Sequence, residues 1–284
     1  MNRLTTVYVD ITKILYNSKV KFSDLISNKS LNRILKILNL KYLIKSDVKR
    51  LEIIKSVIKN QAIEKKGYTL SNYGVWMLNN YLDKTFQLSI MGYRNNLEKI
   101  LLSINQPLIF IDIGANQGVF SLVAAKNKSF IEIHAFEPNL KLTSYLEGNF
   151  FMNKVNSFFI HKVAIGPHCT NIRFYVPDNH SGNGRITSQK SNMQVVSVNR
   201  DYLNKVFIQS NKYYFIKIDV EGSECNVLNE LFNSNINSYI KYIFIEINTK
   251  FSEEDLLIEI LRSNDFYEVS RSGNRVSYDA LYVR

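Results

Sequence analysis

The 284-residue sequence has little cysteine, little proline and no long apolar run, and these shortages exclude whole classes of protein. Its two cysteines, Cys169 and Cys225, lie far apart and in no CxxC spacing, which argues against a disulfide framework and a zinc finger. Asp10 interrupts the apolar core that a secretion signal would need, and no uncharged run reaches the roughly 18 residues of a membrane span. We therefore expect a cytoplasmic protein with reduced thiols.

Basic residues are concentrated at the start of the chain. Residues 1–66 carry 15 Lys and Arg against 5 Asp and Glu, so this segment holds +10 of the total charge of +11. One interpretation is peripheral contact with an anionic lipid surface at the inner face of the membrane. Nucleic acid fits less well, because few aromatic residues lie among the lysines and no RNA-recognition motif occurs. The other interpretation, which the composition favours, is a solvated lysine-rich face.

Residues 1–90 predict a basic helical extension. Apolar residues recur with helical spacing over residues 31–63, with a break near residues 41–46. Further helices are predicted around Asn72–Asp83 and Arg94–Leu102. The apolar stripe of residues 31–63 must be buried, either on the rest of the chain or on a second copy of itself, which leaves a homodimer open.

Residues 91–284 predict a separate domain in which strands and helices alternate. Buried-looking strands occur in LIFIDIG, EIHAFEP, YYFIKIDVEG and YIFIEIN, and helices are predicted at 119–126, 140–151, 223–231 and 253–262. This alternation is typical of a parallel sheet with helices on both faces, the doubly wound α/β class. Two β-like runs, IRFYVP and QVVSVNRDYL, flank a polar loop and predict an inserted hairpin; FYEVSR and ALYVR predict two short final strands.

The first strand ends in an acid and a turn with two glycines. In FIDIGANQGVF, Asp112 precedes Gly114 and Gly118, which would let the backbone approach a ligand closely. Glu137 ends the next strand, where a carboxylate can accept both hydroxyls of a ribose. NAD and S-adenosylmethionine both carry such a ribose, but Asp112 suits the amino-acid portion of S-adenosylmethionine better than a diphosphate. The alternative is structural: Asp112 caps the helix and Glu137 is a surface acid.

In this order, the blocks IDIGANQGVFSL, AFEPN, VAIG, IKIDVEGSE and IFIEIN resemble the FkbM-type S-adenosylmethionine-dependent methyltransferases over roughly residues 90–284. The resemblance implies a class I, Rossmann-like methyltransferase fold, with a seven-stranded, mostly parallel sheet whose last strand is antiparallel. It also implies a set of cofactor-binding residues: Asp112, Gly114, Asn116, Gly118, Glu137 and, near the adenine, Ala164. The chain departs from the family's pattern at Glu230, where a glycine is usual, and at Asn199-Arg200-Asp201, where the family tends to have threonine-leucine-aspartate.

Charged residues in KIDVEG are the candidates for catalysis. Methyl transfer is an in-line displacement that depends mostly on positioning, but a hydroxyl acceptor benefits from a base that takes its proton. Lys217, Asp219 and Glu221 share one strand parity, so they converge on one side if the extended geometry persists. Asp219 and Glu221 are predicted to act as base and orienting group, and Lys217 to neutralise one of them. The alternative is a structural ion pair between Lys217 and Glu221.

Other polar residues receive lesser roles. Glu246 is predicted to line the site. Glu224 either belongs to the site or belongs only to a helix N-terminus. The loop His180–Arg185 either covers an acceptor or is an ordinary hairpin tip. His134 is predicted to be a core residue, and His161 to pack or to lie near the adenine. No histidines have metal-site spacing, so no obligatory metal is expected.

The sequence thus predicts an enzyme that O-methylates a hydroxyl, in a sugar of a surface glycan or of a lipid-linked saccharide. Polyketide, peptide and RNA acceptors remain alternatives, as does a nucleic-acid-binding protein that uses the basic N-terminal helices.

Overall fold

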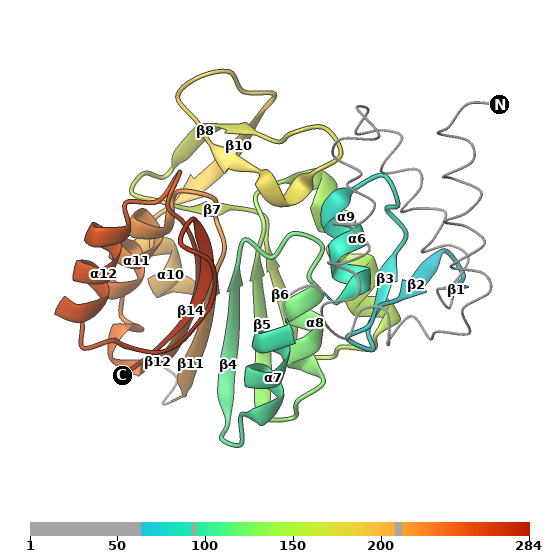
Figure 1. Ribbon diagram of the computed structural model, residues 1–284, viewed down its shortest axis with the longest axis horizontal. Helices are drawn as coiled ribbons and strands as arrows, with labels where there is room; N and C mark the ends of the chain where they lie inside the picture. The colour runs from blue at the N-terminus through green and yellow to red at the C-terminus, as the bar shows by residue number, and fades with distance from the viewer. Residues whose placement is uncertain (1–63, 93–94, 208–211) are drawn as a thin grey trace. The chain divides into compact units, whose positions relative to one another are not determined.

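The computed structural model describes residues 64–92, 95–207 and 212–284 (Figure 1). These residues belong to two compact units, of which the smaller contains residues 64–74 and 79–92 and the larger contains residues 75–78 and 95–284. The helices predicted within residues 31–63 lie outside the described residues. Within the ranges that the structure describes, no helix has the length and hydropathy needed to cross a membrane.

A seven-stranded, mostly parallel sheet forms the centre of the larger unit. Its strands are β4 (Leu108–Ile113), β5 (Phe130–Phe136), β6 (Phe158–His161), β11 (Tyr213–Ile218), β12 (Ile240–Asn248), β13 (Tyr267–Gly273) and β14 (Ser277–Val283). They are arranged in the order β13-β14-β12-β11-β4-β5-β6. Strand β14, the last in the chain, runs antiparallel to both of its neighbours, β12 and β13. The predicted sheet with its antiparallel last strand is therefore confirmed.

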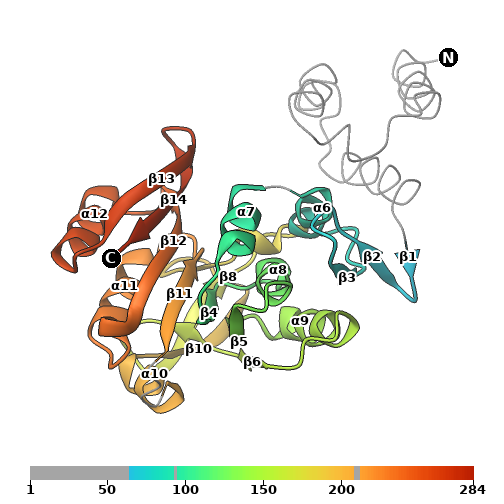
Figure 2. The same ribbon diagram turned by 90° about the horizontal axis from the view of Figure 1, so that it is seen from below.

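Helices cover both faces of this sheet (Figure 2). On one face lie α7 (Asn95–Ser103), α8 (Val119–Ala125) and α9 (Leu140–Met152), and on the other α10 (Arg200–Val206), α11 (Glu224–Phe232) and α12 (Glu254–Ser263). All six residues of β4 are buried, which explains its nearly unbroken apolar sequence. The four helices predicted at 119–126, 140–151, 223–231 and 253–262 are confirmed to within one residue at either end.

A smaller sheet is inserted between β6 and β11. Its strands are β7 (Ala164–Ile165), β8 (Thr170–Tyr175), β9 (Arg185–Ile186) and β10 (Met193–Val198), in the order β7-β10-β8-β9. Strands β8 and β10 pair antiparallel, as predicted for the hairpin, and the short helix η1 (Ser181–Asn183) lies between β8 and β9. In Figure 1 this sheet lies beyond the carboxyl ends of the central strands, the edge at which open α/β sheets bind ligands.

Two predictions of local structure are wrong. The segment Asn72–Asp83 is not helical: Gly74 has a left-handed φ of 69°, and strand β3 (Trp76–Leu78) follows. The backbone N–H and C=O of Trp76 both bond to the side-chain amide of Asn153, the residue that follows α9. The second half of QVVSVNRDYL is also not a strand, because the Asn199 side chain accepts from the backbone N–H of Asp201 and begins α10.

The smaller unit contains strands as well as a helix. Strands β1 (Glu64–Lys65) and β2 (Tyr68–Leu70) pair antiparallel. Helix α6 (Lys84–Met91) begins at Asp83, whose carboxylate accepts from the backbone N–H groups of Thr85 and Phe86. The described part of the predicted helical extension is therefore mixed in structure.

A chain of hydrogen-bonding side chains joins the edge of the central sheet to α10. The Nδ1 atom of His134 on β5 lies 3.0 Å from Nε2 of His161 on β6, and Nδ1 of His161 lies 3.0 Å from the hydroxyl of Tyr202 on α10. The other ring nitrogen of His134 lies 3.5 Å from Glu132. Both histidines are buried, so the prediction that His134 is a core residue is confirmed. His161 packs beside it, within the same row of hydrogen-bonded side chains. Burial lowers the pKa of each histidine to about 4, and the neighbouring imidazole adds to this effect at His161.

This histidine pair should make the fold sensitive to acid. Between its usual pKa of 6.5 and a folded value of about 4, each histidine is protonated in the unfolded chain but not in the folded one. The free energy of unfolding therefore falls as the pH drops through this window. We expect the melting temperature of the wild type to fall more steeply over this range than that of His161→Gln. The exposed His168→Gln serves as the control and should keep the wild-type slope; equal slopes in all three proteins would contradict the assignment.

Candidate active site

The turn that follows β4 brings two backbone segments unusually close. Gly114 and Gly118 have left-handed φ angles of 79° and 81°. A Cβ atom on Gly114 would lie 1.9 Å from the backbone oxygen of Asp219, and one on Gly118 would lie 2.1 Å from a methyl group of Leu146. Both positions therefore require glycine, for conformation and for space. Gly118 also begins α8.

Glu137 is fixed at the carboxyl end of β5 by the same turn. Its Oε2 atom accepts from the backbone N–H of Asn116 at 2.8 Å, and its Oε1 atom accepts from that of Asn139 at 2.8 Å. Each oxygen keeps a lone pair with which a ligand hydroxyl can bond. Burial raises the pKa of Glu137 to about 7, although the two backbone N–H groups act in the opposite direction. The predicted ribose contact of Glu137 thus has suitable chemistry, while the surface-acid alternative does not fit a residue that is 5% exposed.

Asp112 lies behind the turn in a buried ion pair. Its Oδ1 atom accepts from Nζ of Lys217 at 2.9 Å, and its Oδ2 atom accepts from the hydroxyl of Ser121 at 2.7 Å. Asp112 and Lys217 are 1% and 2% exposed, so neither lies on an open surface. In this structure Asp112 holds Lys217 and the start of α8; a contact with the cofactor stays a prediction.

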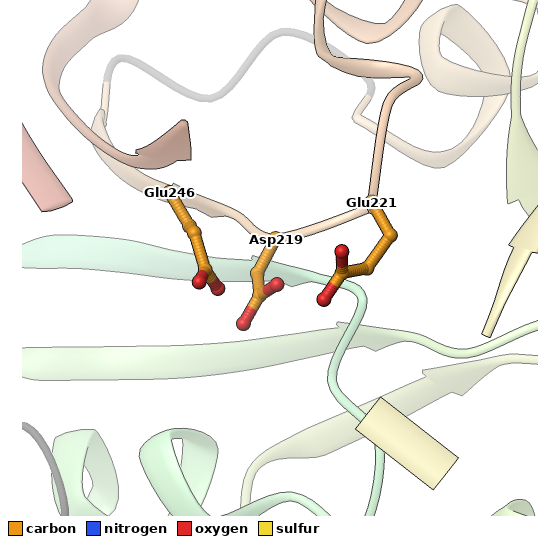
Figure 3. Close-up of side chains that lie close together, drawn as sticks. All are labelled: Asp219, Glu221 and Glu246. Atoms are coloured by element: carbon orange, nitrogen blue, oxygen red, sulfur yellow. The ribbon is translucent and has the colours of Figure 1, made fainter. Parts of the chain in front are cut away.

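Three carboxylates gather where β11 and β12 end. Oxygen atoms of Asp219, Glu221 and Glu246 lie within 4.8 Å of one another, and each residue is partly exposed. Figure 3 shows the three side chains in a row, with Asp219 in the middle and all carboxylates on one side. Such a carboxylate triad can accept protons or hydrogen bonds, and its oxygens also have the chemistry of a divalent-cation site. The prediction of no obligatory metal stays a prediction.

The reason given for this convergence from strand parity is wrong. Strand β11 ends at Ile218, and Glu221 has a left-handed φ of 52°, so the extended geometry does not persist through KIDVEG. A turn at Glu221, rather than alternation, brings its carboxylate beside that of Asp219. Lys217 remains within the strand, with its ammonium 3.8 Å from Asp219 and nearer to Asp112. Lys217 therefore lies close to two carboxylates, and strand parity did not suggest the nearer one, Asp112.

Glu224 lies at the start of α11, and Ala164 lies in the inserted sheet. Glu224 is buried, and its two oxygens accept from the backbone N–H of Gly222 and from the hydroxyl of Ser252. Its burial raises its pKa, so this carboxylate fits the helix N-terminus interpretation better than a role beside the acceptor. Ala164 lies on β7, paired with Ser197 of β10. Its contact with the adenine stays a prediction.

The two departures from the family's pattern contact each other. The backbone N–H of Arg200, the first residue of α10, donates to Oε2 of Glu230 on α11 at 2.7 Å. The side chain of the preceding Asn199 accepts from Asp201. Glu230 and Asn199 therefore each accept from one of the otherwise unpaired backbone N–H groups at the start of α10.

Sequence reasoning missed two serines and one glutamine at this site. Ser121 bonds to Asp112, and Ser181 of η1 donates to the side-chain oxygen of Asn116 at 3.1 Å. Gln117 is 3% exposed, and neither atom of its side-chain amide has a hydrogen-bond partner within the ranges that the structure describes. A buried amide without partners is costly, so a polar ligand at this turn would supply what the chain does not. Of these residues, only Ser121 could have been found from the sequence, because it lies in the first turn of the helix that follows Asp112.

The match to a known family covers the residues described above. Residues 112–268 match the family described as the methyltransferase FkbM domain. No curated protein matches the chain.

Solved structures show a more remote similarity. Precorrin-6y C5,15-methyltransferase from Geobacter metallireducens is 12% identical, with a TM-score of 0.40 over 68% of this chain and 89% of its own. Trm5b from Pyrococcus abyssi is 14% identical, with a TM-score of 0.43 over 78% of this chain and 56% of its own. TrmK from M. capricolum, in complex with S-adenosyl-homocysteine, is 16% identical, with a TM-score of 0.41 over 66% of each chain.

The raised pKa of Glu137 predicts a pH dependence of cofactor binding. The ionised carboxylate can accept from both ribose hydroxyls while it keeps its two backbone N–H partners, whereas the protonated form loses one acceptor position to its own proton. With a pKa of about 7, the fraction of ionised Glu137 grows across neutral pH, so the affinity for S-adenosylmethionine should rise from about pH 6 to about pH 8. Glu137→Gln should weaken binding by roughly 1–3 kcal/mol and remove this dependence, as measured by titration calorimetry.

Glu147→Gln is the matched control for this titration, because Glu147 lies on α9 and forms an exposed ion pair with Lys162. It should bind like the wild type at every pH. If Glu137→Gln kept the wild-type pH dependence, Glu137 would not be the group that contacts the ribose.

Proposed function

Because the chain belongs to the FkbM family of S-adenosylmethionine-dependent methyltransferases, we propose that it methylates a hydroxyl oxygen of a saccharide, in a surface glycan or a lipid-linked saccharide. The carboxylate triad of Asp219, Glu221 and Glu246 is the observation that supports this proposal. Carboxylates in a row offer several acceptor oxygens to the neighbouring hydroxyls of a sugar ring. They also offer a base to the hydroxyl that reacts.

The chain's part in the reaction is to position the hydroxyl and to remove its proton. When bound, the cofactor supplies a methyl group on a sulfonium sulfur. A sugar hydroxyl has a high pKa, so its oxygen is a weak nucleophile until a base accepts the proton as the new carbon–oxygen bond forms. Asp219 is the central member of the carboxylate triad, and its backbone oxygen lies directly against Gly114 of the cofactor turn. This closeness of Asp219 to Gly114 supports a base that lies between the cofactor and the acceptor.

Lys217 has a supporting role in this proposal. Its ammonium lies 2.9 Å from Asp112, 3.8 Å from Asp219 and 3.3 Å from the backbone oxygen of Gly114. A buried cation here offsets the electrostatic repulsion between the neighbouring carboxylates, so that the acids can lie close together.

Substitution of the proposed base tests this function. Asp219→Asn keeps the shape of the side chain and removes its charge, so the rate of methyl transfer should fall by about 10²–10⁴-fold, the usual effect of losing a positioned base. Binding of S-adenosylmethionine and the melting temperature should change little. The measurements are initial rates with saturating cofactor, titration calorimetry and thermal unfolding. Asp255→Asn, on the outer surface of α12, is the matched control and should have wild-type rates.

A chelator separates the two uses of the carboxylate triad. If Asp219 acts as the base, the wild-type rate is the same with and without a chelator of divalent cations. Near-normal turnover of Asp219→Asn would contradict the role of Asp219 as the base. Loss of wild-type activity in chelator, restored by added magnesium, would show that the carboxylate triad holds a divalent cation instead.

A further inference from the structure

A hydrogen bond joins the inserted sheet to the turn after β4. Ser181, in the short helix η1, is 8% exposed and donates its hydroxyl hydrogen to the side-chain oxygen of Asn116. Gly184 follows with no room for a side chain, since a Cβ atom there would lie 2.9 Å from the ring of Phe174. The position of the next residue, Arg185 at the start of β9, is therefore fixed with respect to the turn.

The guanidinium of Arg185 lies over two aromatic rings. Its Cζ atom is 5.2 Å from the ring centre of Tyr175, its neighbour across the β8–β9 pair, and 5.3 Å from that of Phe251. Phe251 comes after β12 and lies against Gly222, where a Cβ atom would be 3.1 Å from the Phe251 side chain. Gly222 directly follows Glu221, so Arg185 lies beside the loop that carries one member of the carboxylate triad.

Arg185 retains hydrogen-bonding capacity in this position. Within the ranges that the structure describes, it forms no ion pair with a carboxylate, in contrast to Arg271, which pairs with Glu268 and Glu254. Aromatic rings contact the faces of a guanidinium and leave the N–H groups at its edge available for a planar, bidentate partner. The residue is half-buried, so a partner can reach it from solvent.

Resting on the proposed function, we propose that Arg185 binds a phosphate group of the acceptor, and that the substrate is a phosphorylated saccharide. Phosphate oxygens match the guanidinium fork, and a positive group is needed to hold an anion near three carboxylates. The sugar hydroxyl then lies at the carboxylate triad while the phosphate lies at the edge of the inserted sheet. Nucleoside diphosphate sugars and lipid diphosphate saccharides share this chemistry.

Binding of inorganic pyrophosphate tests the site without an identified acceptor. Titration calorimetry in the presence of S-adenosyl-homocysteine should show pyrophosphate binding that weakens as the salt concentration rises. Arg185→Gln should weaken it by about tenfold or more, and Arg185→Lys, which keeps the charge but loses the fork, by less. Arg173→Gln removes a charge from the same inserted sheet and should bind like the wild type, because Arg173 is exposed and bonds to the backbone of Ser188.

Thermal unfolding shows whether each variant is folded. If Arg185→Gln does not fold, Arg185→Lys still tests the role of the guanidinium. Equal weakening by Arg173→Gln, or unchanged binding in both Arg185 variants, would overturn the proposal.

Methyl transfer to saccharide fractions then distinguishes the two classes of phosphorylated acceptor, nucleoside diphosphate sugars and lipid diphosphate saccharides. Nucleotide-sugar and lipid-diphosphate fractions are assayed before and after removal of their phosphate groups, and the fraction whose KM rises on that treatment identifies the source. If a dephosphorylated or uronic-acid saccharide is methylated with the same KM as the phosphorylated one, the phosphate proposal is wrong although the proposed function stands. If no fraction is methylated while pyrophosphate binding depends on Arg185, the proposed function fails and the anion site remains.

Discussion

The arrangement of this site depends on how closely the ends of β4 and β11 approach each other. Asp112 and Lys217 are direct neighbours in the sheet and form a buried ion pair, and two residues further on Gly114 touches the backbone of Asp219. Loss of either charge would leave the other buried without its partner, which typically costs roughly 3–5 kcal/mol. A change at this ion pair or at Gly114 would therefore disturb both the turn after β4 and the segment after β11.

From this contact the functional residues extend in two directions. On the β5 side, the turn supplies the backbone N–H of Asn116 to Glu137, and Asn116 in turn accepts from Ser181 of the inserted sheet. On the β12 side, the turn at Glu221 brings a third carboxylate toward Asp219 and Glu246. Asp219 thus contributes its backbone to the cofactor turn and its side chain to the carboxylate triad, so a change in one affects the other.

Features that arise from local sequence were predictable. The buried strand β4, the four helices at 119–126, 140–151, 223–231 and 253–262, and the need for glycine at positions 114 and 118 all follow from apolar patterns and turn chemistry. Features that depend on distant partners were not. Strand β3 is held by the side chains of Asn149 on α9 and of Asn153 just after it, and Lys217 pairs with Asp112 across 105 positions of sequence. Parity failed at Glu221 because a left-handed residue ends the alternation there.

The position of the transferred methyl group is the most direct test of whether this chain methylates oxygen. The wild-type protein is incubated with saccharides from a cell envelope and S-adenosylmethionine that carries a ¹³C-labelled methyl group. The products are then examined by NMR, which distinguishes methyl groups on oxygen from those on nitrogen or carbon. We expect the label to appear as an O-methyl signal on a sugar, and this signal to be lost with Asp219→Asn. Label on nitrogen or carbon, or an undiminished O-methyl signal with the variant, would contradict it.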